Sequence, residues 1–177
     1  MPHGHAEGGS GEASDSRDTV DPSRTYARSL DMLARAPRSV RDLRRRLLLK
    51  GEMEAHVDAA IERLTAAGLL DDAAYARAFV RSKVASQGFS RRRLQQELAK
   101  RGVARDVADA AIVEVLHDDE IDEAANVERA ALKKLRTLAG VDEETQRRRL
   151  YAYLARRGYS VDQVRVVLER LRRMSER

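Results

Sequence analysis

The sequence contains no cysteine and no tryptophan, and only 4% of its 177 residues are aromatic. The absence of cysteine excludes disulfides, thiol nucleophiles and cysteine metal sites, and it suits a reducing compartment. With three prolines and ten glycines, few positions force a break in regular structure. No apolar run approaches the roughly 18 residues of a membrane span, and the N-terminus lacks a secretion signal pattern. These absences predict a soluble cytoplasmic protein without a membrane anchor.

Charged and helix-favouring residues dominate what is present. Charged residues make up 36% of the chain and hydrophobic residues 42%. Alanine, leucine, arginine and glutamate lose little side-chain freedom in a helix, so this mixture predicts an all-α fold. The net charge is +5, but residues 1–23 carry five acids against one arginine, which leaves +9 on the remainder. A basic body of this kind attracts polyanions or acidic protein surfaces.

The first 23 residues are rich in glycine, serine and acids and contain almost nothing apolar to bury. Such a composition predicts a disordered tail. His3 and His5 lie in this tail without other metal ligands nearby, so no metal site is predicted there.

One segment occurs three times: "SVRDLRRRLLLKG" at 39–51, "SRRRLQQELAKRG" at 90–102 and "QRRRLYAYLARRG" at 146–158. In each copy, leucines stand four and eight residues before the final glycine: Leu47 and Leu43, Leu98 and Leu94, Leu154 and Leu150. Apolar residues follow each glycine at six, ten and thirteen positions: Val57, Ile61, Leu64; Ala108, Ile112, Val115; Val164, Leu168, Leu171. Steps of four and three place these side chains on one helix face, which is predicted to form the core.

Each repeat is predicted to contain three helices. The second helix is capped by Ser39 or Ser90, or starts near Asp142 in the third copy, and ends at the glycine in a left-handed conformation. The third helices are expected at 54–67, 104–117 and 160–173, and the leading helices at 24–36, 72–86 and 121–138. Three helix-turn-helix-like units are therefore predicted at 24–69, 70–117 and 118–177. Stacked in line, they would form an elongated body.

Basic residues surround the predicted core leucines and form a ridge in each copy. The candidate binding residues are Arg44, Arg45, Arg46, Lys50, Arg91, Arg92, Arg93, Lys100, Arg101, Arg147, Arg148, Arg149, Arg156 and Arg157. A ridge of this kind is either a solvated helix face or a binding surface for carboxylates or phosphates. Few aromatic residues are available for stacking on single strands, and arginine-rich faces discriminate bases poorly. Tyr151 and Tyr153 flank basic residues and suit either base stacking or the core.

Nothing in the sequence indicates enzyme chemistry. His56 and His117 lack the partners of a catalytic or metal site and are assigned to helix surfaces. The acidic run 118–123 lacks the spaced glycine loop of a calcium site and is read as a helix start. No glycine-rich phosphate loop is present. The sequence therefore predicts a binding protein without catalytic residues, metal or cofactor.

The segment "GLLDDAAYARAFVRSKVASQGFSRRRLQQELAKRGV", residues 68–103, resembles the central signature of the RecX family, regulators of the RecA recombinase. The matching residues are Leu70, Asp71, Asp72, Tyr75, Ala76, Gly88, Leu94, Leu98, Arg101, Gly102 and Val103. The flanking units, "ARSLDMLARAPRSVRDLRRRLLLKG" and "LYAYLARRGYSVDQVRVVLERL", are similar to the family's first and last units. The acidic N-terminal extension departs from the family pattern and is given no role.

The resemblance implies three tandem three-helix units that bind the RecA–DNA filament. It also implies inhibition of ATP hydrolysis, strand exchange and co-protease activity, in DNA repair and SOS regulation. A monomer that also contacts DNA without sequence preference is expected. Two alternatives stay open: a DNA-binding protein of helix-turn-helix-like units that acts independently of recombinase, and a helical adaptor for another acidic partner.

Overall fold

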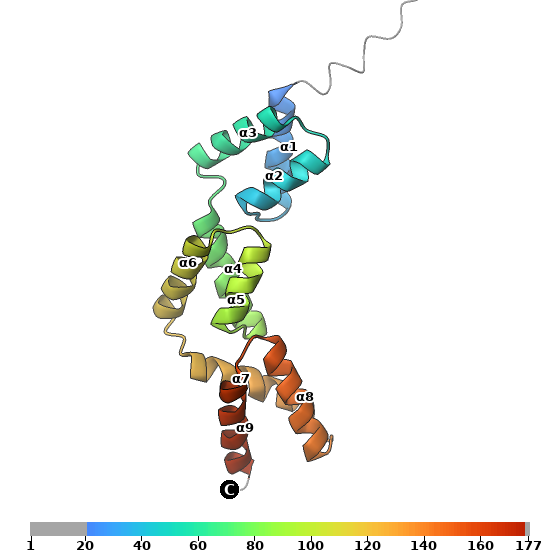
Figure 1. Cartoon of the computed structure of the whole chain (residues 1–177), viewed down its shortest axis with the longest axis vertical. Coiled ribbons are helices and arrows are strands. Elements are labelled where there is room, and N and C mark those ends of the chain that lie inside the picture. The colour runs from blue at the N-terminus through green and yellow to red at the C-terminus, as the bar shows by residue number, and fades with distance from the viewer. Residues whose placement is uncertain (1–20, 176–177) are drawn as a thin grey trace, which may run out of the picture. The chain divides into compact units, whose positions relative to one another are not determined.

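The computed structural model describes residues 21–175, which form nine α-helices and no strand (Figure 1). The helices are α1 (Pro22–Arg35), α2 (Val40–Leu49), α3 (Glu54–Ala66), α4 (Asp72–Gln87), α5 (Arg91–Lys100), α6 (Arg105–Asp118), α7 (Glu123–Arg136), α8 (Glu143–Arg156) and α9 (Val161–Ser175). The predicted all-α fold of three tandem three-helix sets is confirmed. Its elongated arrangement and its unit boundaries stay predictions.

The repeated glycines end the second helix of each set, as predicted. Gly51, Gly102 and Gly158 have φ values of 79°, 81° and 88°, in the left-handed region that glycine adopts without steric cost. The next amide then bonds back into the helix; in the second set, Val103 N donates to Leu98 O at 3.1 Å. The turn thereby satisfies carbonyls that a helix end would otherwise leave without partners.

Two predicted helix starts are confirmed by their side-chain hydrogen bonds. The Ser90 hydroxyl accepts from Arg93 N at 3.2 Å at the start of α5. The Asp142 carboxylate accepts from Thr145 N at 2.8 Å at the start of α8. Each oxygen satisfies an amide of the first helical turn that has no partner within the helix.

The first helix begins earlier than the sequence pattern indicated. The Asp21 carboxylate accepts from Ser23 N at 2.8 Å and caps α1, and Pro22 opens the helix. Proline suits this position because its fixed φ is already helical and its missing N–H is not needed there. Pro22 and Ser23 therefore lie in α1 and Asp21 caps it, so their assignment to the tail was wrong. The rest of the predicted tail, with His3 and His5, lies outside the described residues.

The described residues divide into two compact units: 21–38 with 42–70, and 39–41 with 71–175. In the first unit, α1 packs mainly against α3. Its fully buried side chains include Leu43, Leu47 and Leu64. Burying one leucine side chain stabilises a fold by about 1.5–3 kcal/mol, so the predicted leucine face contributes most of this core.

The second unit contains two apolar cores, one for each remaining set of helices. The second set buries Ala76, Val80, Val84, Leu94, Leu98, Val103, Ala108, Ala111, Ile112 and Val115. The third set buries Val127, Ala130, Ala131, Leu150, Leu154, Tyr159, Val164, Val167 and Leu171. All six leucines predicted from the glycine alignment are buried, whereas Ile61 and Leu168 are only half-buried.

A polar network joins the second and third sets inside this unit. The Tyr159 hydroxyl donates to Gly88 O at 2.9 Å and accepts from Asn126 Nδ2 at 3.0 Å. Ser90 N, at the start of α5, donates to Arg157 O at 3.0 Å. Because Asn126 and Ser90 are buried, these hydrogen bonds satisfy groups that cannot reach water.

Glycine at position 158 is also required by the close approach of α5. A Cβ placed there would lie 2.5 Å from Ser90 Oγ and 3.0 Å from Arg93 N. A related contact recurs at Ser39, which matches Ser90 in the repeat and donates its hydroxyl to Arg101 O. Two buried serines thus each meet the carbonyl that precedes a repeated glycine. The capping role predicted for Ser39 stays a prediction.

Candidate cationic binding surface

Two arginines of the basic ridge of α2 share one aspartate as their ion-pair partner. Asp42 accepts from Arg38 at 2.9 Å, from Arg45 at 2.9 Å and from Arg46 at 2.8 Å. Burial raises the pKa of this carboxyl, but hydrogen bonds from Arg45, Arg46 and Arg38 outweigh it and bring the pKa to about 2. The remaining arginine of this ridge, Arg44, reaches across to α3.

Arg44 Nε donates to Asp58 at 2.9 Å, and its Nη2 donates to Glu54 at 2.5 Å. The hydrogen bonds to Asp58 and Glu54 raise the pKa of the Arg44 guanidinium above its usual value. All three ridge arginines of α2 therefore have carboxylate partners within the first unit.

The ridge of α5 is partly neutralised in the same way. Glu97 accepts from Arg93 at 3.0 Å, from Lys100 at 3.3 Å and from Arg101 at 2.6 Å. Burial raises the pKa of Glu97, but the hydrogen bonds from Arg101 and Lys100 prevail, so its pKa lies below the usual value. The Arg101 guanidinium also stands 4.5 Å from the centre of the Phe79 ring, a cation–π contact.

Both neutralising carboxylates have cations at the same three spacings: four residues before, three after and four after. These are the spacings at which side chains meet on a helix surface. The resulting ion pairs compete with an external anion for the same cations. The pattern is readable in the sequence, but the ridge prediction did not take it into account.

Eight of the fourteen candidate cations form no ion pair within residues 21–175, and Arg157 is one of them. The other seven are exposed: Lys50, Arg91, Arg92, Arg147, Arg148, Arg149 and Arg156. Four of them lie on α8, including its complete arginine triplet. Among the fourteen candidates, the third helix set therefore holds more exposed cations without an ion pair than either of the first two.

Arg157 differs from the other cations of this ridge because it is half-buried and contacts other parts of the protein. Its Nε donates to Gln87 O at 2.5 Å, and its guanidinium lies 3.4 Å from the centre of the Tyr153 ring. Burial lowers the pKa of Arg157 from its usual value. These contacts hold the α4–α5 turn against the third set.

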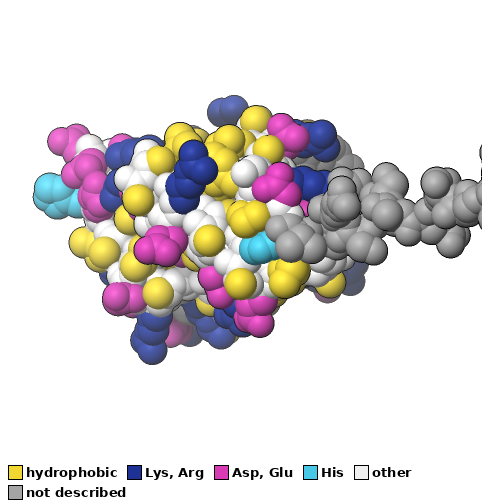
Figure 2. Space-filling model, turned by 90° about the horizontal axis from the view of Figure 1, so that it is seen from above, with side chains coloured by type: hydrophobic (Ala, Val, Ile, Leu, Met, Phe, Trp, Pro, Cys, Tyr) yellow, Lys and Arg dark blue, Asp and Glu magenta, His cyan; other side chains and the backbone are white. Residues whose placement is uncertain are grey.

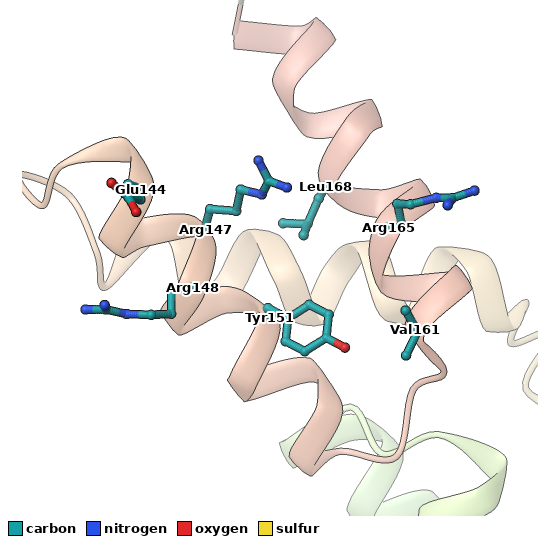
Figure 3. Close-up of a pocket in the computed structure, with 7 residues that line it drawn as sticks. All are labelled: Glu144, Arg147, Arg148, Tyr151, Val161, Arg165 and Leu168. Carbon is teal, nitrogen blue, oxygen red and sulfur yellow. The ribbon is translucent and has the colours of Figure 1, made fainter.

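A hollow of about 480 Å³ lies between α8 and α9. Its lining combines Glu144, Arg147, Arg148, Tyr151, Val161, Arg165 and Leu168. Figure 3 shows Arg147 extending from α8 toward Leu168 on α9, while Arg148 and Arg165 point outward on opposite sides. Tyr151 directs its ring into the space between the two helices. The hollow therefore has an apolar floor with cations along its edges.

The two tyrosines of α8 have different environments. Tyr153 packs against the third core and lies under Arg157, whereas Tyr151 is 40% exposed and faces the hollow. The sequence prediction did not include Arg165 and Val161 among the site residues. Their spacing of four residues on α9, followed by Leu168 three residues later, was the available signal.

The face shown in Figure 2 mixes acidic, basic and apolar side chains without a broad field of one sign. Within residues 21–175 there is no group of three or more potential metal-binding side chains. None of the helices in that range combines the length and apolar composition that crossing a bilayer requires.

The fold and this surface define a class: an all-helical protein of three tandem three-helix sets, with unmatched cations concentrated on the third. Three family models match it in order. They are described as the first, second and third three-helix domains of RecX and match residues 26–64, 71–112 and 120–168.

Curated relatives agree over most of the chain. A "Regulatory protein RecX" from Amycolatopsis mediterranei (strain U-32) is 40% identical over 129 residues, which is 73% of this chain and 72% of that protein. Another, from Prosthecochloris aestuarii (strain DSM 271 / SK 413), is 32% identical over 151 residues, covering 85% of this chain and 95% of the relative. The chain belongs to the RecX family of regulatory proteins.

Solved structures share the fold. The crystal structure of RecX from Lactobacillus salivarius superposes with a TM-score of 0.67 at 19% identity, over 85% of this chain and 96% of that one. A second crystal structure, of a regulatory protein RecX, gives 0.67 at 22% identity, over 90% of this chain and 80% of that one. At these identities the likeness establishes the fold alone.

Proposed function

We propose that this protein binds RecA recombinase filaments on DNA and inhibits their ATP hydrolysis, strand exchange and co-protease activity. The proposal places it in the cytoplasm, in the regulation of DNA repair and the SOS response. It acts as a monomer, without a cofactor and without catalysis of its own. Membership of the RecX family supports the proposal, and the unmatched cations of α8 are the observation that carries it.

The cations of α8 suit a target that is both acidic and repetitive. Arg147, Arg148 and Arg149 are exposed and make no ion pair among the described residues, so binding an anion would not first require breaking an internal contact. Their guanidinium groups can pair bidentately with carboxylates or phosphates. A recombinase filament on DNA offers both groups at regular intervals.

Inhibition follows from occupancy rather than chemistry. A filament presents the same surface on every subunit, and several helix sets on one chain engage it at high effective concentration. A bound chain then obstructs the movement of subunits and the entry of a second DNA strand. Exposed Arg91 and Arg92 on α5 add to this contact, whereas the α2 arginines contribute less because their carboxylate partners compete.

A salt titration separates this function from simple DNA binding. Binding to free DNA through phosphates weakens steeply with salt, because each phosphate contact releases a counterion. We expect the protein to retain binding to recombinase filaments at salt concentrations that remove it from the same DNA without recombinase. Loss of both interactions at the same salt concentration would instead support the recombinase-independent DNA-binding protein.

A further inference from the structure

The hollow between α8 and α9 differs from the ridges because it combines charge with exposed apolar surface. Val161 is 63% exposed and Tyr151 is 40% exposed, although both are large apolar side chains at the lining. Arg147, Arg148 and Arg165 surround them with only Glu144 as a lining acid. Arg165 is further matched by Glu169 at 3.8 Å, so the positive excess rests mainly on Arg147 and Arg148.

We propose that this hollow is a docking site for an acidic protein segment with an apolar face, and that the segment belongs to the recombinase subunit. The inference rests on the proposed function and adds which part of the filament the third helix set recognises. Amphipathic segments commonly bind in this way, with apolar side chains in a groove between two helices and charged residues on its edges. Tyrosine and arginine are also enriched among residues that dominate binding energy.

The lining favours protein over nucleic acid. Grooves for single strands present successive aromatic rings on which bases stack, whereas this floor offers one ring beside aliphatic Val161 and Leu168. A phosphate placed against Val161 and Leu168 would lose water, and these two side chains offer no hydrogen bond in return, which is unfavourable. A protein segment can place an apolar side chain on the floor and a carboxylate beside Arg147.

Two matched pairs of substitutions test this assignment. Val161→Asp alters the floor, and Val166→Asp makes the same change at a 60% exposed position of α9 outside the hollow. Arg147→Glu alters the edge, and Arg149→Glu makes the same change two residues along α8, away from the hollow lining. All four positions are exposed, and circular dichroism should test whether each full-length variant folds.

The measurements are affinity for recombinase filaments on single-stranded DNA and affinity for the same DNA alone. We expect Val161→Asp and Arg147→Glu to weaken filament binding about tenfold. Val166→Asp should weaken it much less, and Arg149→Glu, which removes the same charge outside the hollow, should weaken it less than Arg147→Glu. Affinity for free DNA should be equal within each pair.

Two outcomes would overturn the docking site while leaving the proposed function intact. One is unchanged filament binding by Val161→Asp and Arg147→Glu. The other is an equal loss of filament and free-DNA binding, which would assign the hollow to nucleic acid. Failure of the wild-type protein to bind filaments at all would instead refute the proposed function, and the docking assignment with it.

Discussion

Replacing Gly158 with alanine tests the packing between the second and third helix sets. Gly140 provides a matched control in the same compact unit, because its φ of 86° is close to the 88° of Gly158. The two positions differ in their surroundings. A Cβ at Gly140 would meet no atom within 4 Å, whereas one at Gly158 would lie 3.0 Å from the backbone nitrogen of Arg93.

The backbone conformation alone affects both positions equally. An L-residue in the left-handed region costs about 1–2 kcal/mol, offset by about 0.4–1 kcal/mol because alanine reduces the freedom of the unfolded chain. We therefore expect Gly140→Ala to lower the free energy of unfolding by about 1 kcal/mol. At Gly158 the turn must also move away from α5, and such overpacking typically costs about 1–3 kcal/mol more.

Urea unfolding followed by far-ultraviolet circular dichroism measures both variants. Gly158→Ala should be less stable than Gly140→Ala by about 1–3 kcal/mol. The transition of the second unit is the relevant one, since two compact units need not unfold together. Equal destabilisation of the two variants would refute the close contact between the α8–α9 turn and the start of α5.

Three further outcomes are expected. Tyr159→Phe removes the hydroxyl that bonds to Gly88 O and Asn126. It should lower the free energy of unfolding by about 1–3 kcal/mol in the same urea assay. Tyr151→Phe, at an exposed position, should change this free energy by less than about 0.5 kcal/mol. The folded-state pKa of Asp42, about 2, lies below its ordinary value of 3.8. The stabilisation that ionised Asp42 gives the fold is therefore present above pH 3.8 and lost as the pH falls toward 2. Asp42→Asn should make the free energy of unfolding depend less steeply on pH in this range. An unchanged slope would contradict the ion-pair cluster around Asp42. Replacing Arg147, Arg148 and Arg149 with glutamine should reduce the slope of log affinity for single-stranded DNA against log salt concentration by about 2. Arg45→Gln should reduce this slope by less than about 0.7, because Arg45 already pairs with Asp42. An equal reduction for each arginine replaced would show that the internal ion pairs do not keep cations from binding DNA.

The fold was predictable because its core follows a simple spacing rule. Aligning Gly51, Gly102 and Gly158 identified six leucines that the structure buries. The capping residues Ser90 and Asp142 followed from the same local chemistry of helix ends. Such features depend on neighbours within one or two helical turns, and these are visible in the sequence.

The division of the cations into matched and unmatched sets was harder to predict. Spacing alone accounts for Asp42 and Glu97, whose partners lie three or four residues away in the chain. It fails at α8, where Glu143 stands four residues before Arg147 but forms no ion pair with it in the described part of the chain. Arg157 could not be assigned either, because its acceptor Gln87 lies seventy residues away.

The hollow between α8 and α9 depends on tertiary packing. Leu168 was predicted to be core from its periodicity, but the structure leaves it half-buried at the lining. Whether a face of α9 is covered depends on how it meets α8, and a sequence pattern does not encode the space between two helices.

ATP hydrolysis by RecA recombinase on single-stranded DNA tests the central claim most directly, measured against rising concentrations of this protein. We expect the wild-type chain to suppress hydrolysis. We also expect that the variant with glutamine at positions 147, 148 and 149 must be added at a concentration at least about tenfold higher for the same effect. Hydrolysis that continues unchanged at saturating concentrations of the wild-type chain would contradict the proposed function.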